Sequence, residues 1–221
     1  MLGLLSFKGK EFRYEFIPGN IPTGQNPSWY SFVDEQSVRD RWWNIEEGDV
    51  IFDVGCAYGS YTLPALVLGA SHCYCWNPLD SEMSILAQSL KHNGWEDKAT
   101  LFMAGLYNKI GFLNPDTQEF SQEYKDGMFA VTTLDQYLED QKIKLSNSKC
   151  WMKMDVEGAE LEILKGGTKL LNQFRPNIII ENHVFKIADI QTQVQSFLES
   201  LNFKHVETVP YHAVSHSLYI P

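Results

Sequence analysis

Three side chains in the sequence could move a proton between reacting groups: Asp155, Glu181 and His183. Asp155 directly follows the strand-like run 150–154, and Glu181 follows the three isoleucines of the strand-like run 177–180. An ionised carboxylate at the end of a buried strand is costly unless a cation, a metal or several donors meet it. Histidine is the side chain that most often serves as a general base near neutral pH. We therefore expect these three residues to be catalytic, with His183 as the base.

Two other interpretations of these acids stay open. Lys153 lies two residues before Asp155, on the same face of a strand, so ion pairs of Lys153 with Asp155 or Glu181 would be structural. Alternatively, Asp155, Glu181 and Asn182 would offer oxygen ligands to Mg²⁺. We favour the metal-free interpretation, because two of these three donors also have a structural explanation. For Glu160 we expect only the role of an acid in the first turn of a helix.

A second group of residues could bind a ligand in a turn between a strand and a helix. The strand-like run 50–54 is apolar except for Asp53, and the turn begins where it ends. The candidate residues are Asp53, Gly55, Cys56, Ala57, Tyr58 and Gly59. Glycine lets a ligand approach the backbone, and a helix N-terminus offers N–H groups. The Asp53 carboxylate would repel a pyrophosphate and attract a cation. The turn thus indicates S-adenosylmethionine, with its positive amino and sulfonium groups, rather than a dinucleotide, although an ordinary strand-to-helix turn is the alternative.

Polar or small residues also follow the next two strand-like runs. Asn77 and Pro78 come after the run 73–76, where an acid usually accepts the ribose hydroxyls of a bound adenosine. We expect Asn77, helped by Asp80, to take that role, although Asn-Pro is also a common turn dipeptide. Leu106, beyond the run 100–103, is expected beside the adenine.

The elements that must position these residues alternate between strand and helix. Strands are predicted at 50–54, 73–76, 100–103, 129–132, 150–154 and 177–180, and helices at 60–68, 81–92, 133–138, 157–164 and 191–201. Such alternation predicts an α/β protein with a mostly parallel sheet flanked by helices. Residues 105–127 suggest a hairpin or a long loop, and the tail from 203 to 220 suggests two short strands around Pro210, which would add an antiparallel C-terminal strand.

The N-terminal part of the chain is aromatic. Phe12, Tyr14 and Phe16 alternate with polar residues as in a half-exposed strand, and residues 18–27 have the composition of a loop. Further aromatic residues follow at Trp29, Tyr30, Phe32, Trp42 and Trp43. We expect residues 1–48 to form an extension or lid packed on a core of 49–221 within one domain, although a wall of the acceptor pocket is possible too.

Composition excludes some classes of function. The net charge of −10 over 221 residues disfavours a nucleic-acid binder, because phosphate contacts need clustered Lys and Arg. The 4 cysteines contain no C-x-x-C pair, so we expect no zinc site and reduced thiols. Residues 2–5 are too short for a signal segment, and no run approaches a membrane span. We expect a cytoplasmic protein with no membrane or nucleic-acid partner.

Taken together, these motifs resemble the FkbM-type methyltransferases, which belong to the Rossmann-like S-adenosylmethionine-dependent class. The resemblance spans about residues 49–183 and depends on Val50–Thr62 and Met152–Leu161, with the runs 133–138 and 176–183 beside them. In this sequence Cys56, Ala57 and Tyr58 replace the usual Ala-Asn turn, and Asn77 replaces the usual acid.

The resemblance implies a Rossmann-like fold and O-methylation of a hydroxyl on a sugar, glycan or natural-product acceptor. Asp53 and the glycine turn would hold the methionine end of the cofactor, Asp155 would face the reacting centre, and His183 would take the proton. Two alternatives stay open: a domain that binds S-adenosylmethionine without turnover, and an N-methyltransferase acting on a peptide. The sequence alone does not indicate the acceptor or the oligomeric state.

Overall fold

The computed structural model describes residues 2–114, 116–117, 119–140, 142–143 and 149–221, except for 16–31. The predicted loop at 18–27 and the aromatic residues Phe16, Trp29 and Tyr30 therefore lie outside the described residues. The chain forms two compact units, Met1–Met103 and Ala104–Pro221. Because this division falls inside the expected core, one domain over 1–221 stays a prediction.

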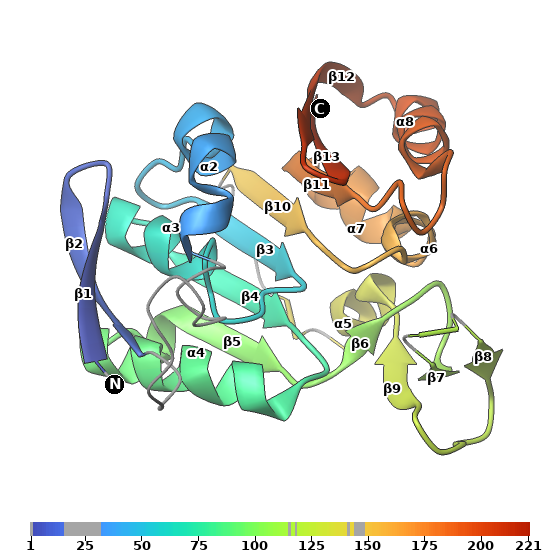
Figure 1. Ribbon diagram of the computed structural model, residues 1–221, viewed down its shortest axis with the longest axis horizontal. Helices are drawn as coiled ribbons and strands as arrows, with labels where there is room; N and C mark the ends of the chain where they lie inside the picture. The colour runs from blue at the N-terminus through green and yellow to red at the C-terminus, as the bar shows by residue number, and fades with distance from the viewer. Residues whose placement is uncertain (1, 16–31, 115, 118, 141, 144–148) are drawn as a thin grey trace. The chain divides into compact units, whose positions relative to one another are not determined.

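The first unit contains a three-stranded parallel sheet, the helices beside it and a β-hairpin (Figure 1). Its elements are β1 (Leu2–Phe7), β2 (Lys10–Glu15), α2 (Gln36–Trp42), β3 (Val50–Val54), α3 (Thr62–Leu68), β4 (His72–Trp76), α4 (Asp80–Asn93), the 3₁₀ turn η2 (Glu96–Lys98) and β5 (Ala99–Phe102). All residues of β3 are buried, as expected of a parallel strand covered on both faces. The strands predicted in this unit are confirmed within one or two residues.

The hairpin β1–β2 packs on the helices of its own unit, as the blue ribbon beside α4 shows in Figure 1. Phe12 and Tyr14 are buried on β2, which confirms the predicted alternation. The Arg13 N–H donates to Asn93 Oδ1 at 2.8 Å, and the Glu15 N–H donates to Ser89 Oγ at 2.9 Å. These bonds to α4 support the interpretation of packing on the core.

The second unit holds two sheets and four helices among its described residues. Its elements are β6 (Gly105–Leu106), β7 (Gly111–Leu113), β8 (Phe120–Ser121), β9 (Phe129–Thr132), α5 (Leu134–Glu139), β10 (Cys150–Met154), α6 (Glu160–Lys165), α7 (Thr168–Phe174), β11 (Asn177–Asn182), α8 (Ile190–Ser200), β12 (Lys204–Tyr211) and β13 (Val214–Ile220). Strands β10 and β11 are parallel, and β13 runs antiparallel between β11 and β12. The predicted antiparallel C-terminal strand is therefore confirmed.

Several predicted boundaries are wrong, for physical reasons. The helix predicted at 157–164 begins only at Glu160, because Glu157 and Gly158 have φ values of 56° and 104°, which no right-handed helix allows. Pro210 lies inside β12 rather than between two strands. Among the described strands β12 is at the edge of its sheet, where a proline is tolerated. Residues 105–127 contribute β6, β7 and β8 to a small sheet with β9.

Candidate functional site

In the first unit, the turn after β3 already uses several of its backbone N–H groups. The Gly55 and Cys56 N–H groups donate to the Trp76 carbonyl oxygen at 2.9 and 3.1 Å, which ties the turn to the end of β4. The Gly59 N–H donates to the Cys56 carbonyl oxygen at 2.7 Å. Helix α3 begins at Thr62, not at residue 60 as predicted. A ligand at this turn would therefore meet mainly the partly exposed Gly55, Ala57 and Tyr58.

Asp53 lies in β3 and is 1% exposed. Thr62 Oγ1, at the start of α3, donates a hydrogen bond to Asp53 Oδ2 at 2.5 Å. Asp53 thus joins the strand to the following helix from inside the unit. Its predicted role toward the cofactor stays a prediction, and this bond gives it a structural role as well.

Gly59 is a glycine for a packing reason that the sequence did not reveal. Its φ is +88°, and a Cβ there would lie 2.5 Å from Leu86 Cδ1 of α4. The absence of a side chain therefore lets α4 lie close to the turn, in addition to any approach of a ligand.

At the end of β4, Asn77 is 6% exposed and its amide is engaged. Asn77 Nδ2 donates to Glu82 Oε2 in the first turn of α4 at 2.6 Å. Pro78 is partly exposed, whereas Asp80 is fully on the surface. The side chain next to Asn77 is thus Glu82, not the expected Asp80.

Glu82 also influences two residues of the glycine turn. Burial, with the charge of Glu82 and a hydrogen bond to it, raises the pKa of Tyr58. Burial is also the main reason why the pKa of the Cys56 thiol is raised. Cys75, Asp53 and Glu82 raise it further. Cys56 is therefore a neutral thiol in contact with Met83, at 3.5 Å between the sulfur atoms, and not a nucleophile.

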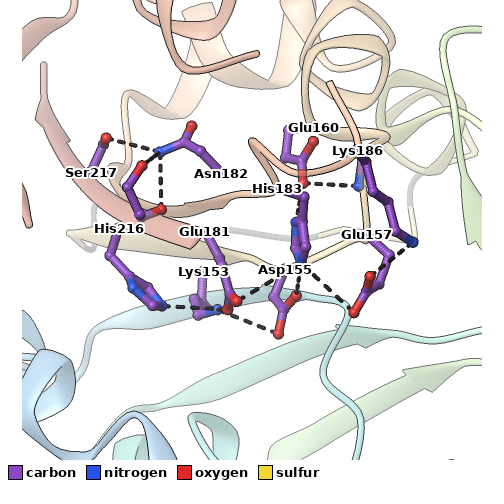
Figure 2. A network of polar contacts seen from close by, with 12 residues as sticks. Lys153, Asp155, Glu157, Glu160, Glu181, Asn182, His183, Lys186, His216 and Ser217 are labelled. Carbon is purple, nitrogen blue, oxygen red and sulfur yellow. Dashed lines mark hydrogen bonds and ion pairs between the residues drawn. The ribbon is translucent and has the colours of Figure 1, made fainter. Parts of the chain in front are cut away.

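In the second unit, the expected catalytic residues converge on one network (Figure 2). Asp155 follows β10, Glu181 is on β11, and His183 follows β11. His183 Nε2 lies 3.5 Å from Asp155 Oδ1 and 3.8 Å from Glu181 Oε1. The side chains of His183, Glu181 and Asp155 are 2%, 14% and 31% exposed, so Asp155 is the most exposed of these three. The sequence therefore predicted this convergence correctly.

The other ring nitrogen of His183 meets a residue whose role the sequence analysis missed. His183 Nδ1 lies 2.5 Å from Glu160 Oε1, and the Glu160 side chain is fully buried. The same oxygen accepts the Gly158 N–H at 3.0 Å. Glu160 is in the first turn of α6, as expected, but its carboxylate is buried against His183 instead of exposed, and the left-handed Glu157 and Gly158 precede it. A proton on Nδ1 would leave Nε2 as the acceptor atom.

The surroundings of His183 raise its pKa. Burial alone would lower it, but the hydrogen bond to Glu160 and the charges of Asp155, Glu160 and Glu181 outweigh burial. Such a base binds a proton more strongly than an ordinary histidine does.

Lys153 provides a positive charge between the two strand-end carboxylates. Its ammonium nitrogen lies 3.8 Å from Asp155 Oδ2 and 3.7 Å from Glu181 Oε2, and its side chain is 2% exposed. Both predicted ion pairs of Lys153 are therefore present together. His216 Nε2 of β13 lies 3.3 Å from Glu181 Oε2, a contact that the sequence did not predict.

Ligand atoms of Asp155, Glu181 and His183 lie within 4.8 Å of one another, close enough to share a metal ion. Such an ion would lie beside the buried Lys153 ammonium, which forms ion pairs with both Asp155 and Glu181. Asn182, the third ligand of the magnesium alternative, points away from Glu181 and donates to Ser217 Oγ at 3.0 Å (Figure 2). Asn182 is therefore engaged elsewhere, and the metal-free interpretation stays a prediction.

Leu106 is buried in β6, where it pairs with Thr132 of β9 in the small sheet. Its expected place beside an adenine stays a prediction. No helix in the described ranges is long and apolar enough to cross a membrane.

Comparison with models of known protein families shows to which family the chain is related. Residues 74–205 match the methyltransferase FkbM domain, which is more than half of the sequence. The chain belongs to the FkbM methyltransferase family. No curated protein matches the sequence.

Solved structures share the fold of this FkbM chain. The FkbM methyltransferase of Methylobacillus flagellatus KT has a TM-score of 0.59 and 14% identity, over 88% of this chain and 54% of that one. The precorrin-6y C5,15-methyltransferase of Geobacter metallireducens GS-15 has a TM-score of 0.55 and 13% identity, over 86% of this chain and 90% of that one. The fibrillarin of Aeropyrum pernix, which contains natively bound S-adenosyl-L-methionine, has a TM-score of 0.57 and 10% identity, over 100% of this chain and 82% of that one.

At these identities the likeness shows the fold alone, and it confirms the predicted Rossmann-like methyltransferase architecture. The chain spans about half the length of the Methylobacillus FkbM relative.

Proposed function

We propose that this FkbM-family chain transfers a methyl group from S-adenosylmethionine to a hydroxyl oxygen of a sugar, glycan or natural-product acceptor. The observation that carries this proposal is the pair formed by Glu160 and His183, with the carboxylates of Asp155 and Glu181 beside it. This is the arrangement of an oriented general base next to hydrogen-bond acceptors for a polyol.

In the proposed reaction, a lone pair of the acceptor oxygen attacks the methyl carbon of the cofactor. The carbon–sulfur bond breaks, its electron pair stays on sulfur, and S-adenosylhomocysteine leaves. The hydroxyl proton must also leave, because a sugar hydroxyl is a weak acid at neutral pH. His183 Nε2 would accept this proton, with its Nδ1 held by Glu160.

Asp155 would touch the acceptor, because it is the most exposed of the three predicted catalytic side chains. Its carboxylate would accept a hydrogen bond from a neighbouring hydroxyl of the acceptor and so align the reacting oxygen, whose own proton passes to His183. Glu181 would keep its charge through Lys153 and stabilise protonated His183 after the transfer.

For the cofactor, the proposal assigns the methionine end to Asp53 and the turn from Gly55 to Gly59. The left-handed φ values of Gly55, Ala57 and Gly59 in this turn, and the bound S-adenosyl-L-methionine of the Aeropyrum fibrillarin, whose fold this chain shares, support this assignment. Asn77, Pro78 and Leu106 are the further cofactor contacts that we propose.

The test has two stages. Isothermal titration calorimetry with S-adenosylmethionine and S-adenosylhomocysteine should give dissociation constants well below millimolar. Mass spectrometry of products from a panel of sugars, glycans, natural products and basic peptides should then show methyl gain on an acceptor oxygen. Absence of binding at millimolar cofactor would refute the proposal, and methylation of peptide nitrogen alone would replace O-methylation by N-methylation.

A further inference from the structure

The carboxylate that a ribose needs is present in the first unit, but at a different position from that of the usual acid. In Rossmann-type nucleotide sites, an acid about twenty residues beyond the glycine turn binds the ribose hydroxyls. Here that position is Asn77, whose single amide oxygen replaces two carboxylate oxygens. A cofactor with a ribose diol would lose a charged acceptor there unless another side chain supplies one.

Glu82 supplies such a carboxylate at hydrogen-bond distance from Asn77. It lies in the first turn of α4 and is partly exposed, and its Oε2 accepts Asn77 Nδ2 at 2.6 Å. A carboxylate has about four acceptor positions, so the bonds from the Asn77 amide and from Tyr58 leave about two positions for hydroxyls. The Asn77 amide fixes the carboxylate, which lowers the cost of ordering it for a ligand.

Glu82 also lies within reach of the glycine turn. Its charge acts on both Tyr58 and Cys56, which lie in that turn. The turn itself is bonded to the last residue of β4 through the Gly55 and Cys56 N–H groups. The Glu82 carboxylate therefore lies near the ends of both β3 and β4, where ligands bind in such folds.

Asp80 does not compete for this role, because its side chain is exposed on the surface at the start of α4. Resting on the proposed use of S-adenosylmethionine, we propose that Glu82 accepts the ribose hydroxyl hydrogen bonds of the cofactor and that Asn77 positions its carboxylate. The acid of the ribose site has moved from the strand end to the following helix.

Calorimetry with S-adenosylhomocysteine tests this assignment. Glu82→Gln and Glu82→Ala should weaken binding about ten- to a hundredfold, the range for a hydrogen bond to a charged group. Asp80→Asn, on the same turn of α4, is the matched control and should bind like the wild type. Thermal melts of each variant check folding, and the isosteric Glu82→Gln change keeps the test informative where Glu82→Ala unfolds.

Two further arms make the assignment specific for the ribose. The wild type should bind the 2′-deoxyribose analogue of S-adenosylhomocysteine more weakly than S-adenosylhomocysteine itself. Glu82→Ala should bind the two compounds with nearly equal affinity. Asn77→Asp alone should weaken binding, because it places two carboxylates at the 2.6 Å contact. The exchanged pair Asn77→Asp with Glu82→Gln should recover most of the affinity.

The outcomes separate two failures. A wild type that binds S-adenosylhomocysteine, with Glu82→Gln and Glu82→Ala binding equally well, would overturn the role of Glu82 and leave the proposed function standing. A deoxy analogue that loses as much affinity in Glu82→Ala as in the wild type would overturn the role of Glu82 in the same way. A wild type without affinity for the cofactor would overturn the proposed function, and the ribose assignment with it.

Discussion

His183 Nδ1 and Glu160 Oε1 lie 2.5 Å apart, and both side chains are buried. This contact fixes the orientation of the imidazole ring, because the neutral ring can donate from only one of its nitrogens. We therefore predict that Glu160→Gln lowers the pKa of His183 and slows methyl transfer about ten- to a hundredfold. NMR titration of His183 gives the first quantity and single-turnover kinetics the second.

Glu162→Gln is the control for this substitution, because Glu162 is on the same helix and pairs with Lys165 at the surface. Binding of S-adenosylhomocysteine should stay within about twofold of the wild type in both variants. An unchanged His183 pKa in Glu160→Gln would contradict the positioning role even if activity fell.

The pH dependence follows from the raised pKa of His183. Its contribution to stability is fully present below the unfolded value near 6.5 and is lost as pH rises through the higher folded-state value. Activity should change in the opposite sense, because only the neutral ring accepts a proton. We expect the stability difference between wild type and His183→Gln to shrink from pH 6 upward, as measured by urea unfolding, while the single-turnover rate rises.

His212→Asn, at an exposed position of the β12–β13 turn, should leave both pH profiles unchanged. A rate that falls as pH rises through the same window would argue against His183 as the base.

The ammonium of Lys153 should make a divalent metal unnecessary. Because it lies within 4.0 Å of both Asp155 and Glu181, these carboxylates already have a cationic partner. We predict that methyl transfer persists at its full rate in excess EDTA and that added Mg²⁺ does not raise the melting temperature. A loss of activity that Mg²⁺ restores would favour the metal alternative instead.

The two roles of Asp53 can be separated experimentally. Asp53→Asn keeps an acceptor for Thr62 but removes the charge, so cofactor affinity should fall at least tenfold while most stability remains. Thr62→Val removes only the hydroxyl partner and should cost about 1–2 kcal/mol of unfolding free energy with affinity preserved. Calorimetry and urea unfolding measure the two effects. Equal affinity in Asp53→Asn and the wild type would limit Asp53 to its structural role.

Gly59→Ala should be destabilising because of the positive φ of Gly59 and because of a clash of the new methyl group with α4. Gly48, which has a similar φ but no close neighbour, separates the two effects. A Cβ at Gly59 would lie 2.5 Å from Leu86 Cδ1 and the φ of Gly59 is +88°, whereas Gly48 has a φ of +91° with nothing within 4 Å of its Cβ position. We predict a loss of about 1 kcal/mol for Gly48→Ala and about 2–4 kcal/mol for Gly59→Ala in urea unfolding. Equal losses would show that packing against α4 adds nothing.

The main elements of the fold could be predicted because their patterns are local. The three consecutive isoleucines of β11 and the alternation of strands with helices required no knowledge of distant contacts. The convergence of Asp155, Glu181 and His183 was predictable too, since β10 and β11 are parallel neighbours.

Glu160 and Glu82 were harder to predict, because an acid in the first turn of a helix has the same pattern whether it is exposed or buried. A left-handed Glu157 precedes Glu160, and a positive φ at a glutamate is not a conformation that the sequence pattern predicts. Glu82 was missed because it is in the first turn of α4 and not at the strand end, so its contact with Asn77 depends on how α4 begins after the turn.

The polar contacts between β11 and β13 favour one register of these two strands. Asn182 Nδ2 lies 3.1 Å from the Ser215 carbonyl oxygen and 3.0 Å from Ser217 Oγ, while His216 faces Glu181 on the other side of the sheet. A slip of β13 by one residue would exchange the two faces, bring His216 against Asn182 and withdraw it from Glu181. The terminal hairpin therefore has one alignment that satisfies its buried polar groups, so misaligned folding intermediates would be penalised at the same strand that supplies Glu181.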